Sequence, residues 1–183
     1  MGLALRLASI DIPSYPVRRQ AVVKTETPVK ILLVDDIPAN LLSLEAVLDN
    51  PGLSLTRADS GQEALNHLTQ GDFAVVLMDV RMPVMDGIET AASIRKTDPD
   101  GNMPIIFLTA AQNNDIDKAR AYAVGAIDYL LKPYVPSELR TKVAILSDLF
   151  REKKELVVHI DYLNNRVREL EKRNSMLKEE KAK

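Results

Sequence analysis

Short apolar runs alternate with amphipathic segments from Lys30 to Phe150, and this alternation is the strongest constraint on the fold. Most runs are four or five residues long and rich in Val, Ile and Leu, which is typical of buried strands, whereas Leu53-Ser54-Leu55-Thr56 alternates and predicts a more exposed strand. We expect strands at 31–34, 53–56, 75–79, 104–108 and 127–131, and helices that begin near residues 38, 60, 88, 119 and 137. Five strand–helix units in succession predict an α/β domain with a five-stranded, doubly wound parallel sheet that carries helices on both faces.

Capping and turn residues place several helix ends. Pro38 suits the first turn of a helix. Ser60 and Glu63 have the spacing of a capping box, and Gly71 follows that helix as a stop signal. Ser137 is expected to cap the last helix.

Composition limits the classes of protein that this chain can be. Its 183 residues allow one domain with a full core plus an appendage. No apolar run approaches the ~20 residues of a membrane span, so we expect no membrane insertion and a cytoplasmic location. The chain has no Cys, which excludes disulfides and thiolate metal sites. A net charge of -2 gives no reason to expect direct binding to nucleic acid.

Polar side chains follow the apolar runs at the points where four of the expected strands end. They are Asp35, Asp36, Asp79, Thr109 and Lys132. The carboxyl ends of parallel strands meet at one edge of the sheet, where ligands bind. Clustered carboxylates repel one another and need compensating positive charge, which a Mg²⁺ ion can supply while keeping several of its waters.

Such a site suits phosphoryl transfer. Asp79 follows the most apolar run and would act as the nucleophile that forms an aspartyl phosphate. Lys132 and the Thr109 hydroxyl would contact the phosphoryl oxygens. Each of these residues alone is more often a helix cap or a surface residue, but their joint occurrence at strand ends favours one site.

Four motifs in this order resemble the receiver domain of two-component response regulators. They are Ile31-Leu32-Leu33-Val34-Asp35-Asp36, Met78-Asp79-Val80-Arg81-Met82-Pro83-Val84-Met85-Asp86-Gly87, Leu108-Thr109-Ala110 and Tyr129-Leu130-Leu131-Lys132-Pro133. The resemblance implies a flavodoxin-like fold and a Mg²⁺ site. Asp36, Asp79 and the backbone carbonyl of Arg81 would bind the metal directly, and Asp35 would help through water.

The resemblance also implies roles beyond the metal site. Thr109 and Tyr129 match the family's switch pair, whose hydroxyl and ring move on phosphorylation. The Lys132-Pro133 bond would be cis. Arg81 and Ala111 would flank the phosphorylated aspartate and tune the lifetime of the acyl phosphate.

The last helix continues far beyond the domain. From Ser137 to Lys183 the chain has no Pro or Gly, and apolar residues repeat every seven positions. With Leu at d and β-branched residues at a, the pattern predicts a parallel two-stranded coiled coil, and an Asn in the seam would fix its register. The seam residues are Leu149, Leu156, Ile160, Leu163, Val167, Leu170, Asn174 and Leu177, with Lys153 at an a position near the domain. A solvated single helix is the alternative.

We therefore expect an N-terminal arm at 1–29, a receiver domain at 30–150 and a coiled-coil extension at 151–183. The arm is expected to be flexible, either without function or as a docking segment. The resemblance implies phosphorylation by a sensor histidine kinase or phosphotransfer protein, with self-phosphorylation and autodephosphorylation but no turnover of an external substrate.

Three alternatives to a dimeric, phosphorylation-dependent switch stay open. The chain could be a structural dimerisation or adaptor protein whose receiver acts independently of phosphorylation. The helix after the domain also looks like linkers that join receivers to histidine kinases or diguanylate cyclases, so the chain could be a piece of such a protein with a downstream output domain. A hydrolase that forms a phosphoaspartate is disfavoured, because no insertion could cover a substrate.

Overall fold

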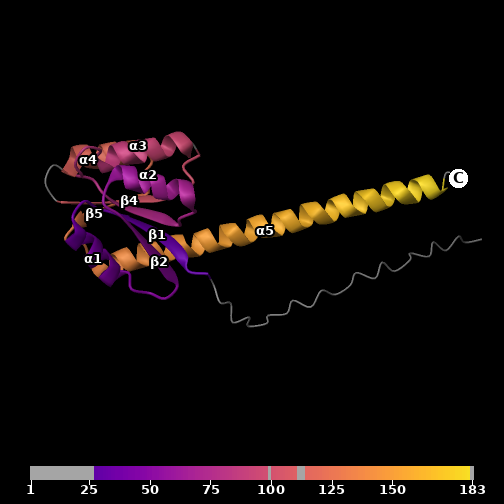
Figure 1. Cartoon of the computed structure of the whole chain (residues 1–183), viewed down its shortest axis with the longest axis horizontal. Helices are drawn as coiled ribbons and strands as arrows, with labels where there is room; N and C mark the ends of the chain where they lie inside the picture. The colour runs from indigo at the N-terminus through magenta and orange to yellow at the C-terminus, as the bar shows by residue number, and fades with distance from the viewer. Residues whose placement is uncertain (1–26, 99, 111–113, 182–183) are drawn as a thin grey trace, which may run out of the picture.

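A five-stranded parallel sheet forms the centre of the molecule, with the strand order β2-β1-β3-β4-β5. The computed structural model describes residues 27–98, 100–110 and 114–181 (Figure 1). The strands are β1 (Val29–Val34), β2 (Leu53–Ala58), β3 (Val75–Asp79), β4 (Ile105–Ala110) and β5 (Asp128–Lys132). The helices are α1 (Pro38–Val47), α2 (Gly61–Gln70), α3 (Gly87–Thr97), α4 (Asn114–Ala123) and α5 (Pro136–Lys181). The predicted doubly wound α/β fold is confirmed.

Two hydrophobic layers hold the helices on the sheet. On one face, alternate strand residues pack against α2, α3 and α4, with Phe107 and Ile88 in that layer. On the other face they pack against α1 and the start of α5, where Leu44, Leu139 and Val143 are buried. β1, β3 and β4 are buried on both faces, which explains why they are the most continuous apolar runs in the sequence.

Several element boundaries differ from the sequence-based expectation. α4 begins at Asn114 rather than near Ala119, because residues 114–118 are mostly polar and showed no apolar periodicity. α5 begins at Pro136, so the prediction that Ser137 caps this helix is wrong: Ser137 lies in its first turn. Proline is well suited to that first position because its missing N–H would have no partner there. The capping role of Ser60 is confirmed, since its Oγ accepts a hydrogen bond from the Glu63 N–H.

Most of the expected N-terminal arm, residues 1–26, lies outside the described residues. Val29 begins β1 and is buried, so the last residue of the expected arm belongs to the sheet. Its N–H donates to the Gly52 carbonyl at the start of the neighbouring strand.

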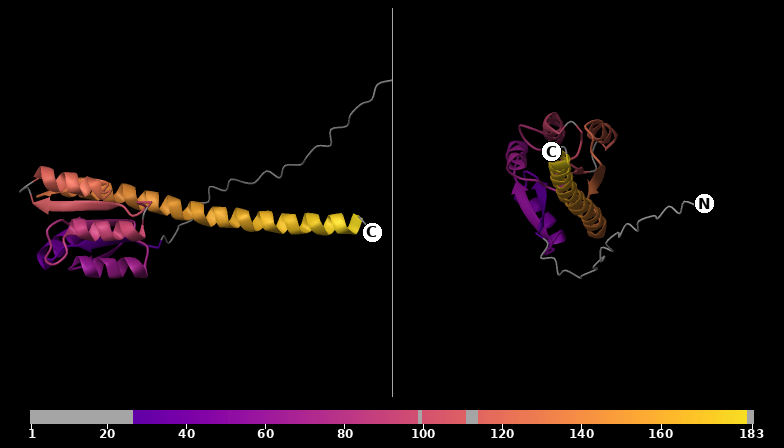
Figure 2. Two further views of the ribbon diagram at one scale, coloured as in Figure 1. Left: turned by 90° about the horizontal axis from the view of Figure 1, so that it is seen from above. Right: turned by 90° about the vertical axis from the view of Figure 1, so that its right-hand side faces the viewer.

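α5 is 46 residues long and leaves the domain as a single projecting helix (Figure 2). Every residue from Glu152 to Lys178 is exposed. Three basic side chains tie its exit to loops that precede β2, β3 and β4: Arg151 donates to the Gly52 carbonyl, Lys154 pairs with Asp72, and Lys153 donates to the Asn102 side chain at 2.8 Å. The helix therefore leaves at the amino ends of the strands. Among the described residues, no helix is long and apolar enough to cross a membrane.

The loop from β3 to α3 holds one strained residue. Val84 has φ of 69°, in the left-handed region, and its side chain is fully exposed. A β-branched residue is unfavourable there, because its Cβ crowds the backbone, at a cost of about 1–2 kcal/mol. No packing of the exposed side chain offsets this cost.

We predict that Val84→Asn raises the free energy of unfolding by about 1 kcal/mol, because Asn tolerates the left-handed region better than a β-branched residue. Urea unfolding at fixed protein concentration, followed by circular dichroism, measures the change. Val84→Thr is the matched control: it adds a polar group but keeps the β-branch, so its stability should stay close to that of the original protein. Equal stabilisation by both variants would show that polarity, not backbone strain, is responsible.

Candidate functional site

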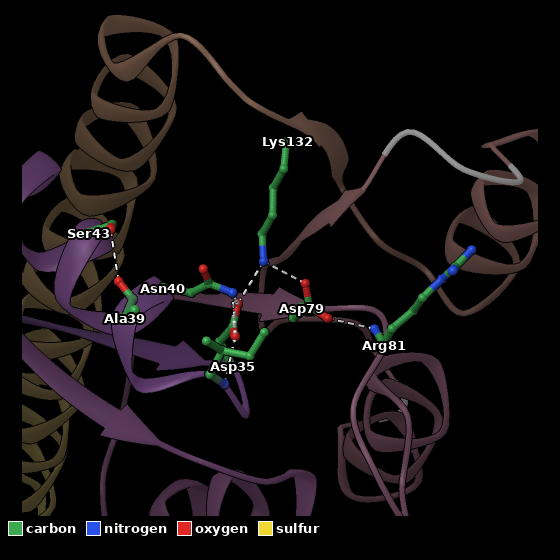
Figure 3. Close-up of polar contacts among 8 residues, drawn as sticks. Asp35, Ala39, Asn40, Ser43, Asp79, Arg81 and Lys132 are labelled. Carbon is green, nitrogen blue, oxygen red and sulfur yellow. Dashed lines mark hydrogen bonds and ion pairs between the residues drawn. The ribbon is translucent and has the colours of Figure 1, made fainter.

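The strand-end residues named above meet at the carboxyl edge of the sheet. Asp35 and Asp36 follow β1, Asp79 ends β3, Thr109 lies near the end of β4 and Lys132 ends β5. The strand register places Asp79 beside Leu108 and Thr109 beside Leu131, so neighbouring strands end at similar heights. Figure 3 shows the Lys132 side chain reaching across this edge toward the two aspartates.

Lys132 bridges two buried carboxylates. Its Nζ lies 2.7 Å from Asp35 Oδ2 and 2.6 Å from Asp79 Oδ1 (Figure 3). Asp35 is 1% exposed and Asp79 is 9% exposed, so neither carboxylate is well hydrated. The ammonium group supplies the positive charge that two close carboxylates need.

Asp35 is held by more than the lysine. Its carboxylate accepts hydrogen bonds from the Ile37 N–H at 3.0 Å and from Asn40 Nδ2 at 2.9 and 3.0 Å (Figure 3). Asn40 lies in the first turn of α1 and joins that helix to the site. Sequence reasoning missed Asn40; its position near the start of the helix that follows Asp35 was the available signal.

The backbone around Asp79 is tightly placed. Asp79 Oδ2 accepts a hydrogen bond from the Arg81 N–H at 2.7 Å, while the Arg81 side chain points away from the carboxylates (Figure 3). At the start of α3, Gly87 packs directly on the Asp79 backbone: an added Cβ would lie 2.1 Å from the Asp79 carbonyl oxygen. Any side chain at position 87 would therefore displace the candidate nucleophile.

Burial and charge act in opposite directions on this cluster. Burial raises the pKa of the Asp79 carboxyl above its usual range, although hydrogen bonding and attraction from Lys132 partly oppose that rise. Burial alone would lower the pKa of Lys132, but its contacts with Asp35 and Asp79 outweigh burial and raise it. The lysine therefore stays charged at neutral pH.

Asp36 differs from the other two acids. It is half-buried, and its carboxylate makes no hydrogen bond or ion pair with any described residue. Within the part of the chain that the structure describes, no three acidic or His side chains are close enough to hold a metal by themselves. The available donors are thus the Asp36 and Asp79 carboxylates together with backbone oxygen, which are hard ligands that fit Mg²⁺.

The expected switch residues lie on adjacent strands. The Thr109 hydroxyl is buried and has no hydrogen-bond partner in the described residues. An unpaired buried hydroxyl is costly, so a site that keeps one suggests a ligand oxygen as its partner. Tyr129 is half-buried and packs against the hydrophobic layer formed with α2, α3 and α4. The Lys132-Pro133 bond is cis, as the resemblance implied, and Ala111 lies outside the described residues.

Comparison with known proteins agrees with this geometry. The family model of the response regulator receiver domain matches residues 31–144, more than half of the chain. The chain belongs to this family. It is 36% identical over 120 residues to the transcriptional regulatory protein PrrA of Mycobacterium tuberculosis, a match that covers 66% of this chain and 50% of PrrA. It is 39% identical over 114 residues to the sensor protein GacS of Pseudomonas syringae, covering 60% of this chain and 12% of GacS.

A solved structure gives the same fold. The receiver domain of the Francisella response regulator 1452 superposes with a TM-score of 0.60 at 31% identity, covering 68% of this chain and 99% of that domain. The chain spans about half the length of PrrA, and the matches to PrrA and to the Francisella domain leave about a third of this chain uncovered.

We predict that Lys132→Met lowers the free energy of unfolding by about 3 kcal/mol at pH 7, because two buried carboxylates lose their shared cation. Without Lys132, burial raises the pKa of Asp79 in the folded variant with less opposition, so the folded state binds more protons than the unfolded chain and regains stability as the pH falls from 7 toward 5. Urea unfolding at several pH values measures this.

Lys142→Met is the matched control. Lys142 also contacts two acids, Asp128 and Glu138, but this cluster is more open to water. Its loss should cost about 1 kcal/mol or less and show little dependence on pH in that range. Equal effects of the two substitutions would contradict the role assigned to Lys132.

Proposed function

We propose that this protein is a response regulator that accepts a phosphoryl group on Asp79 in a Mg²⁺-dependent reaction and transmits the change through a dimeric coiled-coil stalk. The donor would be the phosphohistidine of a sensor histidine kinase or a phosphotransfer protein. The observation that carries the proposal is the bridge from Lys132 to Asp79, beside an Asp36 carboxylate and a Thr109 hydroxyl that have no partner among the described residues.

The chemistry follows from these atoms. A carboxylate oxygen of Asp79 attacks the phosphorus, the O–P bond forms as the N–P bond breaks, and the electron pair of the broken bond stays with the donor imidazole. Lys132, already in contact with Asp79 Oδ1, stabilises negative charge on the phosphoryl oxygens. The Thr109 hydroxyl would donate to one of those oxygens and so gain a hydrogen bond that no other described residue supplies.

The metal would be held by Asp36, Asp79 and the Arg81 carbonyl, with Asp35 acting through water. When bound, Mg²⁺ neutralises charge that develops on the phosphoryl group during transfer. Asp35 is already fully engaged by Asn40, Ile37 and Lys132, which suits an indirect role.

The domain offers a direct path from the site to the stalk. Lys132 ends β5, and α5 begins at Pro136. The helix then crosses the sheet face, with Leu139 and Val143 buried, and leaves at the opposite edge. A change at Lys132 can thus shift the start of a helix whose far end forms the stalk.

The stalk carries the features of a two-stranded coiled coil. Its predicted seam residues from Leu156 onward lie on a helix that is exposed in the single chain and are mostly Leu, Ile and Val. A second copy of the chain in parallel would bury them, and Asn174 would fix the register. Lys153, the first seam position beyond the domain, donates to Asn102 of its own receiver, so the paired part would begin at Leu156.

We predict that the molar mass in solution corresponds to a dimer in the presence of Mg²⁺, with or without beryllofluoride, a mimic of the aspartyl phosphate. Light scattering over a concentration series measures it. If the stalk alone holds the pair, beryllofluoride changes the geometry but not the mass. A mass that rises only with beryllofluoride would mean that phosphorylation controls assembly.

Asp79→Asn is the matched control, because it removes the phosphoacceptor and keeps the shape of the side chain. It should keep the dimer and abolish incorporation of radiolabelled phosphate from acetyl phosphate. Phosphate retained by this variant would place the acceptor elsewhere. If Asp79→Asn also left partner binding unchanged under phosphorylating conditions, the protein would be an adaptor instead.

We predict that Leu163→Glu weakens the dimer at least tenfold, because it places a charge in the seam. Met176→Glu is the matched control, since Met176 is exposed on the outer side of the stalk and should leave the dissociation constant within about twofold. Sedimentation equilibrium measures both, and equal effects would argue against this seam.

A further inference from the structure

A second apolar stripe on the stalk lies away from the predicted dimer seam. Val158 is 69% exposed and Tyr162 is 64% exposed, and His159 stacks against the Tyr162 ring. In the heptad pattern that places Leu156 and Leu163 at d, Val158 and Tyr162 fall at the outer positions f and c. A parallel partner helix would therefore leave both side chains open to water.

Val158 and Tyr162 lie on the same side of α5 as Arg151, which contacts the loop beside the start of β1. Arg151 lies seven residues before Val158 and eleven before Tyr162, so the three share one side of the helix. Arg151 donates to the Gly52 carbonyl, and the same carbonyl accepts the N–H of Val29, the first residue of β1. Val29, where the N-terminal segment enters the sheet, and Arg151, below the stripe, therefore donate to the same carbonyl oxygen.

The N-terminal segment has an apolar stretch at the matching distance. Ala21-Val22-Val23 precedes Val29 by six to eight residues, which span up to about 25 Å when extended. Along the helix, Val158 and Tyr162 lie about 10 and 16 Å beyond Arg151. The segment thus reaches both side chains without turning back over the domain.

Charge favours the same pairing. The segment 17–24 carries Arg18, Arg19 and Lys24 and no acidic residue. Acidic Asp161 lies beside Tyr162 in the stripe region. Basic residues that flank an apolar stretch would therefore meet an acid beside an apolar surface.

We propose that the N-terminal segment, through Ala21-Val22-Val23, docks on the outer face of the stalk at Val158 and Tyr162 of its own chain. The docked segment covers apolar surface that dimerisation leaves open and ties the entry of the chain to the exit of α5. This interaction needs neither phosphorylation nor the seam, so it goes beyond the proposed function and can fail independently of it.

Disulfide trapping in the full chain tests the contact, because the protein has no Cys of its own. Val22→Cys combined with Val158→Cys should oxidise at least fivefold faster than Val22→Cys combined with Met176→Cys. Met176 is a matched control: it is 69% exposed on the same side of the helix but about 38 Å beyond Arg151, which exceeds the reach of residue 22. The product must run at the mass of one chain on a denaturing gel.

A third pair of cysteines tests whether the segment docks instead on another apolar surface within its reach. An open groove of about 360 Å³ lies between α1 and β2, and Leu42 and Leu53 are among its lining residues. Val22→Cys with Leu42→Cys should react slowly. Faster trapping at Leu42, a product with the mass of two chains, or equal rates for all pairs would each overturn the proposal.

Tryptic cleavage after Arg18, Arg19 and Lys24 gives a second readout in chains without added Cys. Val158→Ser with Tyr162→Ser should speed cleavage at these sites at least threefold, whereas Met176→Ser should leave the rate unchanged. Circular dichroism shows whether the helix stays intact in both variants. An intact helix with no change in cleavage would contradict docking at this surface.

Discussion

The contact of Lys132 with Asp35 and Asp79 is the interaction on which the rest of the site depends. Two carboxylates from β1 and β3 come together at a buried edge, and they can do so only because an ammonium group from β5 lies between them. β1 and β3 are neighbours in the sheet and β5 is its edge strand beyond β4, so this contact also joins the centre of the sheet to one edge. The same lysine that stabilises the fold is placed to meet incoming negative charge.

The electrostatics of this cluster relate stability to reactivity. Burial raises the pKa of Asp79, which means that its ionised form is less stable in the folded protein than it would be in water. An anionic nucleophile that is poorly solvated reacts more readily than a hydrated one, provided that the lysine keeps it ionised at neutral pH. The tight approach of Gly87 to the Asp79 backbone carbonyl limits movement of the backbone that carries this carboxylate. Charge thus acts on the side chain of Asp79, and packing acts on its backbone.

The sequence was sufficient for the architecture and for the residues at the strand ends. Continuous apolar runs such as Val75-Val76-Leu77-Met78 are buried on both faces and could be recognised without ambiguity. Tertiary contacts were not visible in the same way. Asn40 binds Asp35 only because α1 folds back over the end of β1, and Lys153 donates to Asn102, 51 residues away. The left-handed backbone at Val84 could not be expected either, since a β-branched residue argues against it.

The stalk exit adds a constraint on how any signal can travel. α5 is anchored at its exit by Arg151, Lys153 and Lys154, which bind loops at the amino edge of the sheet, and Asp79 lies at the opposite edge. A helix fixed at its exit and packed along the sheet resists bending, because its buried side chains Leu139 and Val143 are held in a close-packed layer. A change that begins at Lys132 must therefore move α5 as a body or release one of the exit contacts. Release of Lys153 from Asn102 would free the first proposed seam position beyond the domain. The exit contacts are therefore where a change at Asp79 and the proposed pairing of the stalk would meet.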